Sequence, residues 1–251
     1  MKLVRIGAVT IFFGSFLWLA PIMHAEEQVC AIRIPTEKLQ SGILEVSDEL
    51  EIRKTALTSI MLCAIQETEN LSNDLQTISL KSDTSVLRET RAVFLNQLAS
   101  ARSFYQSEFE KIGSLTIYGS KFFAETLRSW RTAIYIPRIK RISNYIAWLK
   151  TGESIAIGET RLSETTATVR TLRLHNNPDV AGLLLEAKRN LTSARTSHNR
   201  AEQVFENLNV PDDSLELTRV SLISLSAGYQ NFFDIGEMVK EMLTANLGAI
   251  K

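Results

Sequence analysis

Residues 39–78 read LQSGILEVSDELEIRKTALTSIMLCAIQETENLSNDLQTI. Apolar side chains recur in this stretch at steps of three and four residues, and Arg53 and Thr68 interrupt the row without shifting its register. The apolar positions are Leu39, Ile43, Val46, Leu50, Leu57, Ile60, Ala64, Leu71, Leu75 and Ile78. This spacing is the a and d pattern of helical bundles and coiled coils, whereas a half-buried strand alternates at every second residue. The stretch therefore predicts one long helix that packs against other helices.

The same periodicity continues in a second segment, from Leu87 to Tyr135. Glycine weakens a helix, so we expect a kink or break between Gly113 and Gly119. Proline disfavours helical geometry in the residue before it and fits the first turn of a new helix. We therefore expect one helix to end near Tyr135 and a third to start at Pro137.

The third segment becomes less regular around Gly152 and Gly158. Asn177-Pro178-Asp179 then predicts the start of a fourth helix, with an asparagine cap, a proline in the first turn and an acid near the helix dipole. Asp213 and Glu216 resemble a capping box that opens a fifth helix. Only residues 29–34 hint at a strand.

These segments and their short connections predict an all-α fold. We expect an elongated antiparallel bundle of about five long helices with coiled-coil-like packing, shaped as a rod. Residues 26–251 would form this single bundle domain, and its first part, about 26–41, would be a short N-terminal arm.

Residues 1–25 have the organisation of an export signal. Lys2 and Arg5 form a basic head, residues 6–22 are apolar, Pro21 breaks the helix, and Ala25 offers a small residue for cleavage. We therefore predict a signal peptide and a secreted or periplasmic mature protein. The alternative is an uncleaved anchor through residues 6–23, because Met23 is larger than the residue usually found at that position. Contact with the membrane is expected only in this alternative.

The two cysteines, Cys30 and Cys63, would meet an oxidising environment after export. We predict an intramolecular Cys30–Cys63 disulfide, which can close only if the chain runs extended past Pro35 and turns back near Ser41-Gly42. The loop closure would contribute about 3 to 4 kcal/mol under the chain-entropy model. Buried free thiols and an intermolecular bridge are the alternatives.

Signatures of catalysis are missing from the sequence. His175 and His198 have no histidine or cysteine at metal-ligand spacing, and neither serine-hydrolase motifs nor phosphate-binding glycine loops occur. We therefore predict no catalytic residue, no metal and no cofactor. The balance of 28 acidic and 28 basic residues also gives no reason to expect nucleic-acid binding.

The strongest local bias lies in residues 121–150, where seven basic residues face one acid, Glu125, with aromatic residues between them. The candidate interaction surface comprises Arg128, Trp130, Arg131, Tyr135, Arg138, Lys140, Arg141, Tyr145 and Trp148. Basic and aromatic groups together suit anionic sugars, lipid headgroups or a nucleic-acid strand. The favoured interpretation is internal, with the basic segment beside the acidic residues of 26–76 and Trp130 and Trp148 in the core.

The sequence thus predicts an exported, non-enzymatic helical bundle with a structural or protein-interaction role at the cell envelope. Its partner would be another protein or an envelope component. The alternative is a bundle that binds an apolar or anionic ligand near residues 121–150.

Overall fold

The computed structural model describes residues 46–78, 85–206 and 213–248, and every secondary-structure element in these ranges is a helix. The predicted all-α class is therefore confirmed. The predicted signal peptide, Cys30 and the turn at Ser41-Gly42 lie outside the described residues.

The first two helices form an antiparallel hairpin. Helix α2 (Val46–Thr77) pairs with α3 (Ser85–Lys111), which ends in a short 3-10 turn, η3 (Ile112–Ser114). Helix α4 (Ile117–Trp130) follows, and the Thr116 hydroxyl caps it by accepting a hydrogen bond of 3.1 Å from the Gly119 N–H. The break expected between Gly113 and Gly119 is confirmed.

The boundary expected between Tyr135 and Pro137 is present, with Pro137 in the first turn of α5, but the helix is not broken there. Helix α4 passes without interruption through one π-helical turn, η4 (Arg131–Tyr135), into α5 (Ile136–Thr171). The Ile136 N–H donates to the Arg131 carbonyl five residues back, which is the wider π spacing. Proline lacks an N–H and its ring crowds the carbonyl four residues earlier. The π turn directly before Pro137 accommodates the proline, so the chain stays helical through this position.

The start of the fourth predicted helix is confirmed in detail. A 3-10 turn, η5 (Leu174–Asn176), precedes α6 (Pro178–Glu206). The Asn177 side-chain oxygen accepts hydrogen bonds from the N–H groups of Asp179 and Val180, at 2.9 and 3.2 Å. These bonds satisfy two of the N–H groups that a helix start leaves without partners. The last helix is α7 (Ser214–Gly248).

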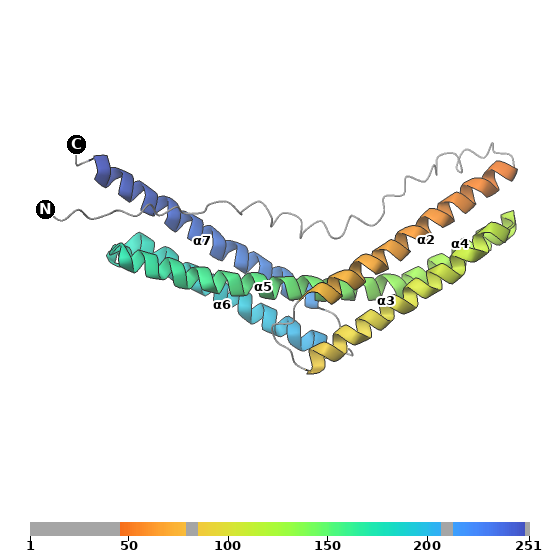
Figure 1. Ribbon diagram of the computed structural model, residues 1–251, viewed down its shortest axis with the longest axis horizontal. Helices are drawn as coiled ribbons and strands as arrows, with labels where there is room; N and C mark the ends of the chain where they lie inside the picture. Colours follow the sequence, from red (N-terminus) through yellow and green to blue (C-terminus); the bar gives the residue numbers. More distant parts are fainter. Residues whose placement is uncertain (1–45, 79–84, 207–212, 249–251) are drawn as a thin grey trace.

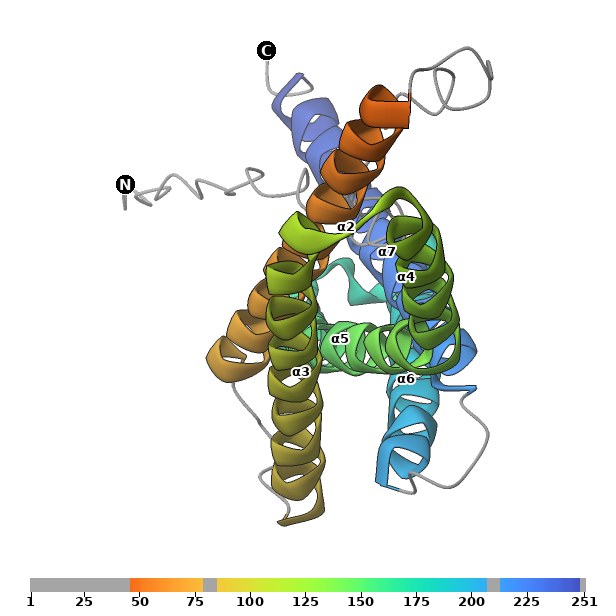
Figure 2. The same ribbon diagram turned by 90° about the vertical axis from the view of Figure 1, so that its right-hand side faces the viewer.

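The described helices form two arms that meet at an angle (Figure 1). We call α2, α3, α4 and the beginning of α5 the first arm, and the rest of α5 with α6 and α7 the second arm. The view from the side shows α2, α3 and α4 as three rods of the first arm (Figure 2). The molecule is elongated as predicted, but it is bent rather than a straight rod, and the α4–η4–α5 helix runs through both arms (Figure 1).

One large apolar core fills the first arm and continues across the junction of the arms into α6, through Ala201 and Phe205. The second arm has two smaller cores. One is built around Ile155, Leu191 and Leu225, and the other comprises Val169, Val180, Ile235 and Val239. The junction is thus part of the largest core, which joins the arms by packing as well as by the continuous helix.

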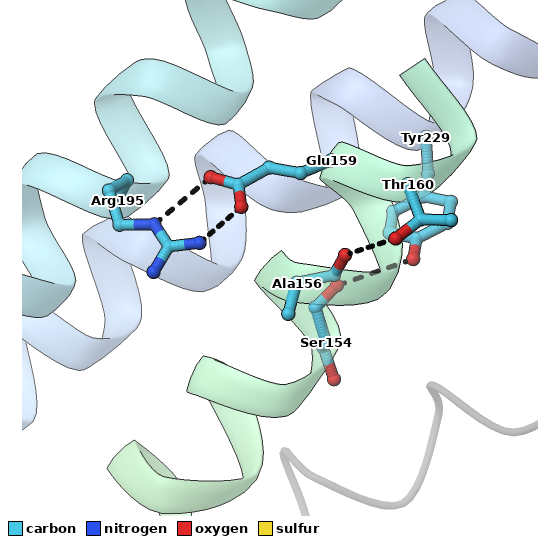
Figure 3. Close-up of polar contacts among 6 residues, drawn as sticks. All are labelled: Ser154, Ala156, Glu159, Thr160, Arg195 and Tyr229. Carbon is cyan, nitrogen blue, oxygen red and sulfur yellow. Dashed lines mark hydrogen bonds and ion pairs between the residues drawn. The ribbon is translucent and has the colours of Figure 1, made fainter. Parts of the chain in front are cut away.

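Polar contacts add to the small cores of the second arm (Figure 3). Arg195 of α6 forms a two-pronged ion pair with Glu159 of α5, with a hydrogen bond of 3.0 Å from its Nε. The Tyr229 hydroxyl of α7 donates to the Ser154 carbonyl of α5 at 3.4 Å. These contacts fix α6 and α7 on α5. Within the described residues, no helix combines the length and apolar character needed to cross a membrane.

Candidate functional site

The basic and aromatic residues selected from the sequence all lie on the α4–η4–α5 helix, but they point in different directions. Tyr135, Tyr145 and Trp148 are buried, Trp130, Arg131 and Arg141 are partly buried, and Arg128, Arg138 and Lys140 are exposed. The predicted set is therefore divided between the protein interior and the surface.

The partly buried Trp130 and buried Tyr135 belong to an aromatic cluster around the π turn. Trp130 stacks on Phe104 of α3 with ring centres 3.8 Å apart, and the edge of Tyr105 meets it at 5.3 Å. Tyr105 and Tyr135 lie edge to face at 5.0 Å. Such aromatic pairs stabilise a fold beyond the effect of their buried area. These rings thus join α3 to the shared helix.

Charged groups complete this cluster. Arg131 Nη1 donates to the Tyr105 hydroxyl at 2.6 Å, and its guanidinium lies 5.1 Å from the centre of the Tyr135 ring. The Tyr135 hydroxyl donates to Glu67 Oε2 of α2 at 2.5 Å. Burial raises the pKa of Tyr135 and of Tyr105 well above the usual range, and Glu67 raises that of Tyr135 further. Both phenols therefore stay protonated at neutral pH and act as hydrogen-bonding ties between helices.

Tyr145 and Trp148 lie at the junction of the arms. The Tyr145 ring packs edge-on between Phe94 of α3, at 5.2 Å, and Phe205 of α6, at 5.1 Å. Burial raises the pKa of Tyr145 to about 12, and its hydroxyl donates to the Leu87 carbonyl at 3.2 Å. Tyr145 therefore contacts both arms at once, which confirms the favoured interpretation that this part of the segment is core.

The neighbouring histidine, His198, is a strongly perturbed basic group at the junction. His198 stacks on Trp148 with ring centres 4.8 Å apart, and the Trp148 indole donates to the His198 carbonyl at 2.9 Å. Burial lowers the pKa of His198 to about 4, and Nδ1 has no hydrogen-bond partner among the described residues. A catalytic histidine is normally oriented by a hydrogen-bonded third group, which this ring lacks on Nδ1. We therefore assign His198 to packing. His175 is exposed in the η5 turn.

Part of the basic charge is matched by acids of α2. Lys121 lies 3.5 Å from Glu49, and Lys150 lies 2.9 Å from Asp74. A hydrogen bond from Arg53 and the charge of Lys121 hold the pKa of Glu49 below its usual value, against the opposing effect of desolvation. The predicted pairing of the basic segment with the acidic first helix is thus found at both ends of residues 121–150.

The middle of the segment exposes a different surface. Arg128, Arg138 and Lys140 are exposed and form no ion pair within the described part of the chain. On the same helix, Tyr118 is 80% exposed and Phe122 is 72% exposed, which is more than any other large apolar side chain among the described residues. We call Tyr118, Phe122, Arg128, Arg138 and Lys140 the outer face.

Tyr118 and Phe122 were not selected from the sequence, although a signal was present. They lie one turn apart but out of register with the apolar row of Phe123, Leu127 and Trp130. A large aromatic pair outside the buried row of a helix points to solvent, so the register itself marks this pair.

Within the described ranges, no group of three or more histidine, cysteine, aspartate or glutamate side chains is placed to hold a metal ion. Comparison with known proteins finds no family model, no curated protein and no solved structure that matches this chain.

Proposed function

We propose that this chain is an exported, non-enzymatic helical scaffold that binds another protein or an envelope component through its outer face. The observation that carries the proposal is the exposure of Tyr118 and Phe122, at 80% and 72%, one turn apart on α4. Large aromatic side chains are costly to leave in water and are enriched, together with arginine, in the energetic centres of protein interfaces.

The contacts beneath the outer face support a scaffold role. Arg131, Tyr135 and Glu67 tie the π turn to α2 and α3, so the exposed side chains project from a helix held on its opposite side. A rigid surface loses little conformational entropy when a partner binds. Arg128, Arg138 and Lys140 are exposed and form no ion pair within the described part of the chain. They favour a partner with acidic groups near an apolar contact.

The alternative, a ligand held among the aromatic residues of 121–150, is less well supported. Trp130 stacks directly on Phe104, and Trp148 on His198, so one broad face of each indole is already covered by a neighbour. A catalytic role has equally little support, since the buried phenols stay protonated and serve as structural ties.

Export adds a second part to the proposal. An oxidising compartment would allow Cys30 to pair with Cys63, which is partly buried on α2, and so tie the N-terminal arm to the first arm. Mass spectrometry of a non-reduced digest of the mature protein would detect the linked peptides. Recovery of both cysteines as alkylated free thiols from a digest alkylated before reduction would contradict this part.

The experiment for the outer face uses a photo-crosslinking amino acid placed at Phe122 in cells that express the full chain. We expect a discrete crosslinked product, because this side chain would lie inside the interface. The same amino acid at Thr192, exposed on α6 in the second arm, is the control position and should give no such product.

A second variant separates binding from folding. Tyr118→Ser with Arg128→Glu should remove the crosslink from position 122 while leaving the thermal midpoint unchanged, since both side chains are exposed. A crosslink that survives this double variant, or equal products from positions 122 and 192, would overturn the proposal.

A further inference from the structure

One side of helix α7 is exposed to solvent. Four large apolar side chains are exposed on it, which is more than on any other described helix: Leu215 at 53%, Val220 at 38%, Ile223 at 58% and Phe233 at 44%. Its opposite side packs on α5 and α6 through Ser221, Leu225 and Tyr229. The exposed residues are thus outside the intramolecular contacts of the second arm.

The middle of this helix carries no charge. The stretch from Val220 to Phe233 contains no aspartate, glutamate, lysine or arginine, although 22% of the chain is charged. At 1.5 Å per residue these 14 residues span about 21 Å, or four turns. Exposed helix surfaces normally carry charged side chains. A surface that lacks charged side chains and carries apolar ones instead is typical of the centre of an interface.

The arrangement along this face is self-complementary when the helix is read in both directions. Ser226 and Ala227 are small and exposed, and they lie at the middle of the uncharged stretch. Positions at equal distances from this middle are 223 and 230, 220 and 233, and 219 and 234. The first pair joins Ile223 to Gln230, the second joins Val220 to Phe233, and the third joins Arg219 to Asp234.

We propose that this face of α7 is the interface of a homodimer, in which a second copy of the chain packs its own α7 antiparallel against it. A twofold axis near Ser226 and Ala227 makes the contact isologous, so each pair occurs twice. The small residues allow the two helices to approach closely at the axis. Val220 then meets Phe233 of the second copy, and Arg219 meets Asp234 of the second copy at both ends of the uncharged stretch.

The charges at these ends favour a second copy of this chain as the occupant. Arg219 forms only a long intrahelical ion pair of 3.4 Å with the exposed Glu216, and such a pair contributes little to stability. Asp234 accepts a hydrogen bond of 2.8 Å from Gln230 on one of its two oxygens. Both groups therefore retain bonding capacity for the partner. One pair of helices over four turns makes a small interface, so the dimer should depend on concentration.

The test is sedimentation velocity of the mature full-length chain from about 5 to about 500 µM. We expect a concentration-dependent dimer that Ala227→Glu converts to monomer, because a charge would be buried at the axis. Thr192→Glu places the same charge on exposed α6 and should leave the dimer intact. Circular dichroism checks that both variants keep their helical content.

A charge exchange keeps the proposal testable if Ala227→Glu fails to fold. Arg219→Asp should weaken the dimer about tenfold, and Arg219→Asp combined with Asp234→Arg should restore it. A monomer at every concentration, a dimer indifferent to Ala227→Glu, or a double exchange that does not recover association would each overturn the proposal.

Discussion

Gly152 of α5 packs directly against the ring of His198 on α6. A Cβ atom at this position would lie 2.9 Å from both Cε1 and Nε2 of the histidine ring. The ring cannot move aside freely, because it is stacked on Trp148. The glycine that interrupts the helical pattern in the sequence is therefore a packing position, and α5 continues through it.

Gly152→Ala should lower the free energy of unfolding by about 1 to 3 kcal/mol, as overpacking of a closed core does. Gly182 is the matched control, because no atom lies within 4 Å of a Cβ built on it in α6. Gly182→Ala should raise stability by about 0.5 to 1 kcal/mol through helix propensity. Urea unfolding followed by circular dichroism measures both, and equal effects at the two positions would contradict the packing assignment.

His198 should make stability depend on pH. Its pKa is about 4 in the folded chain and close to 6.5 when unfolded, so the unfolded state binds a proton first as the pH falls. The contribution of neutral His198 to the free energy of unfolding is therefore fully present above about pH 6.5 and is lost as the pH falls from 6.5 to 4. Between pH 7 and pH 4.5 we expect a loss of about 2 kcal/mol.

The control for this pH effect is a side chain that does not titrate. His198→Phe, or His198→Gln if the larger ring does not fit, should flatten the stability curve over this interval. A variant whose unfolding free energy falls as steeply as that of the native chain would show that other groups cause the dependence.

At the scale of the helical elements, side chains of the π turn form the hydrogen bonds that hold the shared helix on α2 and α3. Tyr135→Phe removes the hydroxyl that donates to Glu67 of α2 and leaves that partly buried carboxylate without this donor. We expect a loss of about 1 to 2 kcal/mol. Tyr118→Phe removes the same atom from an exposed side chain and should be neutral. Thermal unfolding compares the two, and a neutral Tyr135→Phe would show that the hydrogen bond adds nothing.

The sequence predicted most of the element boundaries for local reasons. Asn177 and Pro178 carry the chemistry of a helix start within three residues, and Gly113 and Gly119 weaken the helix where α3 ends. The continuity of the helix at Pro137 was not predicted, because it requires a π turn that the neighbouring helices hold. The packing role of Gly152 was not predicted either, because its partner, His198, is distant in sequence.

The candidate site was predicted in part. Periodicity placed Tyr145 and Trp148 near apolar rows, and the structure buries both. Exposure of Arg128 and burial of Tyr135 depend on which side of one helix meets α2 and α3, and local spacing does not contain that information. The exposed Tyr118 and Phe122 were detectable by register, but composition alone gave no reason to separate them from the core.

At the scale of the whole molecule, the proposed function depends on the continuous helix that both arms share. It carries the outer face in the first arm, crosses the junction at Tyr145 and Trp148, and supports α6 and α7 in the second arm (Figure 1). A partner bound at α4 and a second copy bound at α7 would then be held at a fixed separation by one rigid element.

The most direct test of this claim is the distance between spin labels at Thr126 and Thr160, both exposed on the shared helix on opposite sides of Pro137. Labels on noncanonical amino acids leave the native cysteines untouched. For 34 residues of continuous helix, double electron–electron resonance should give one narrow distribution near 50 Å. A broad distribution, or one centred well below this length, would mean that the chain breaks at Pro137 and that the arms are not held by one helix.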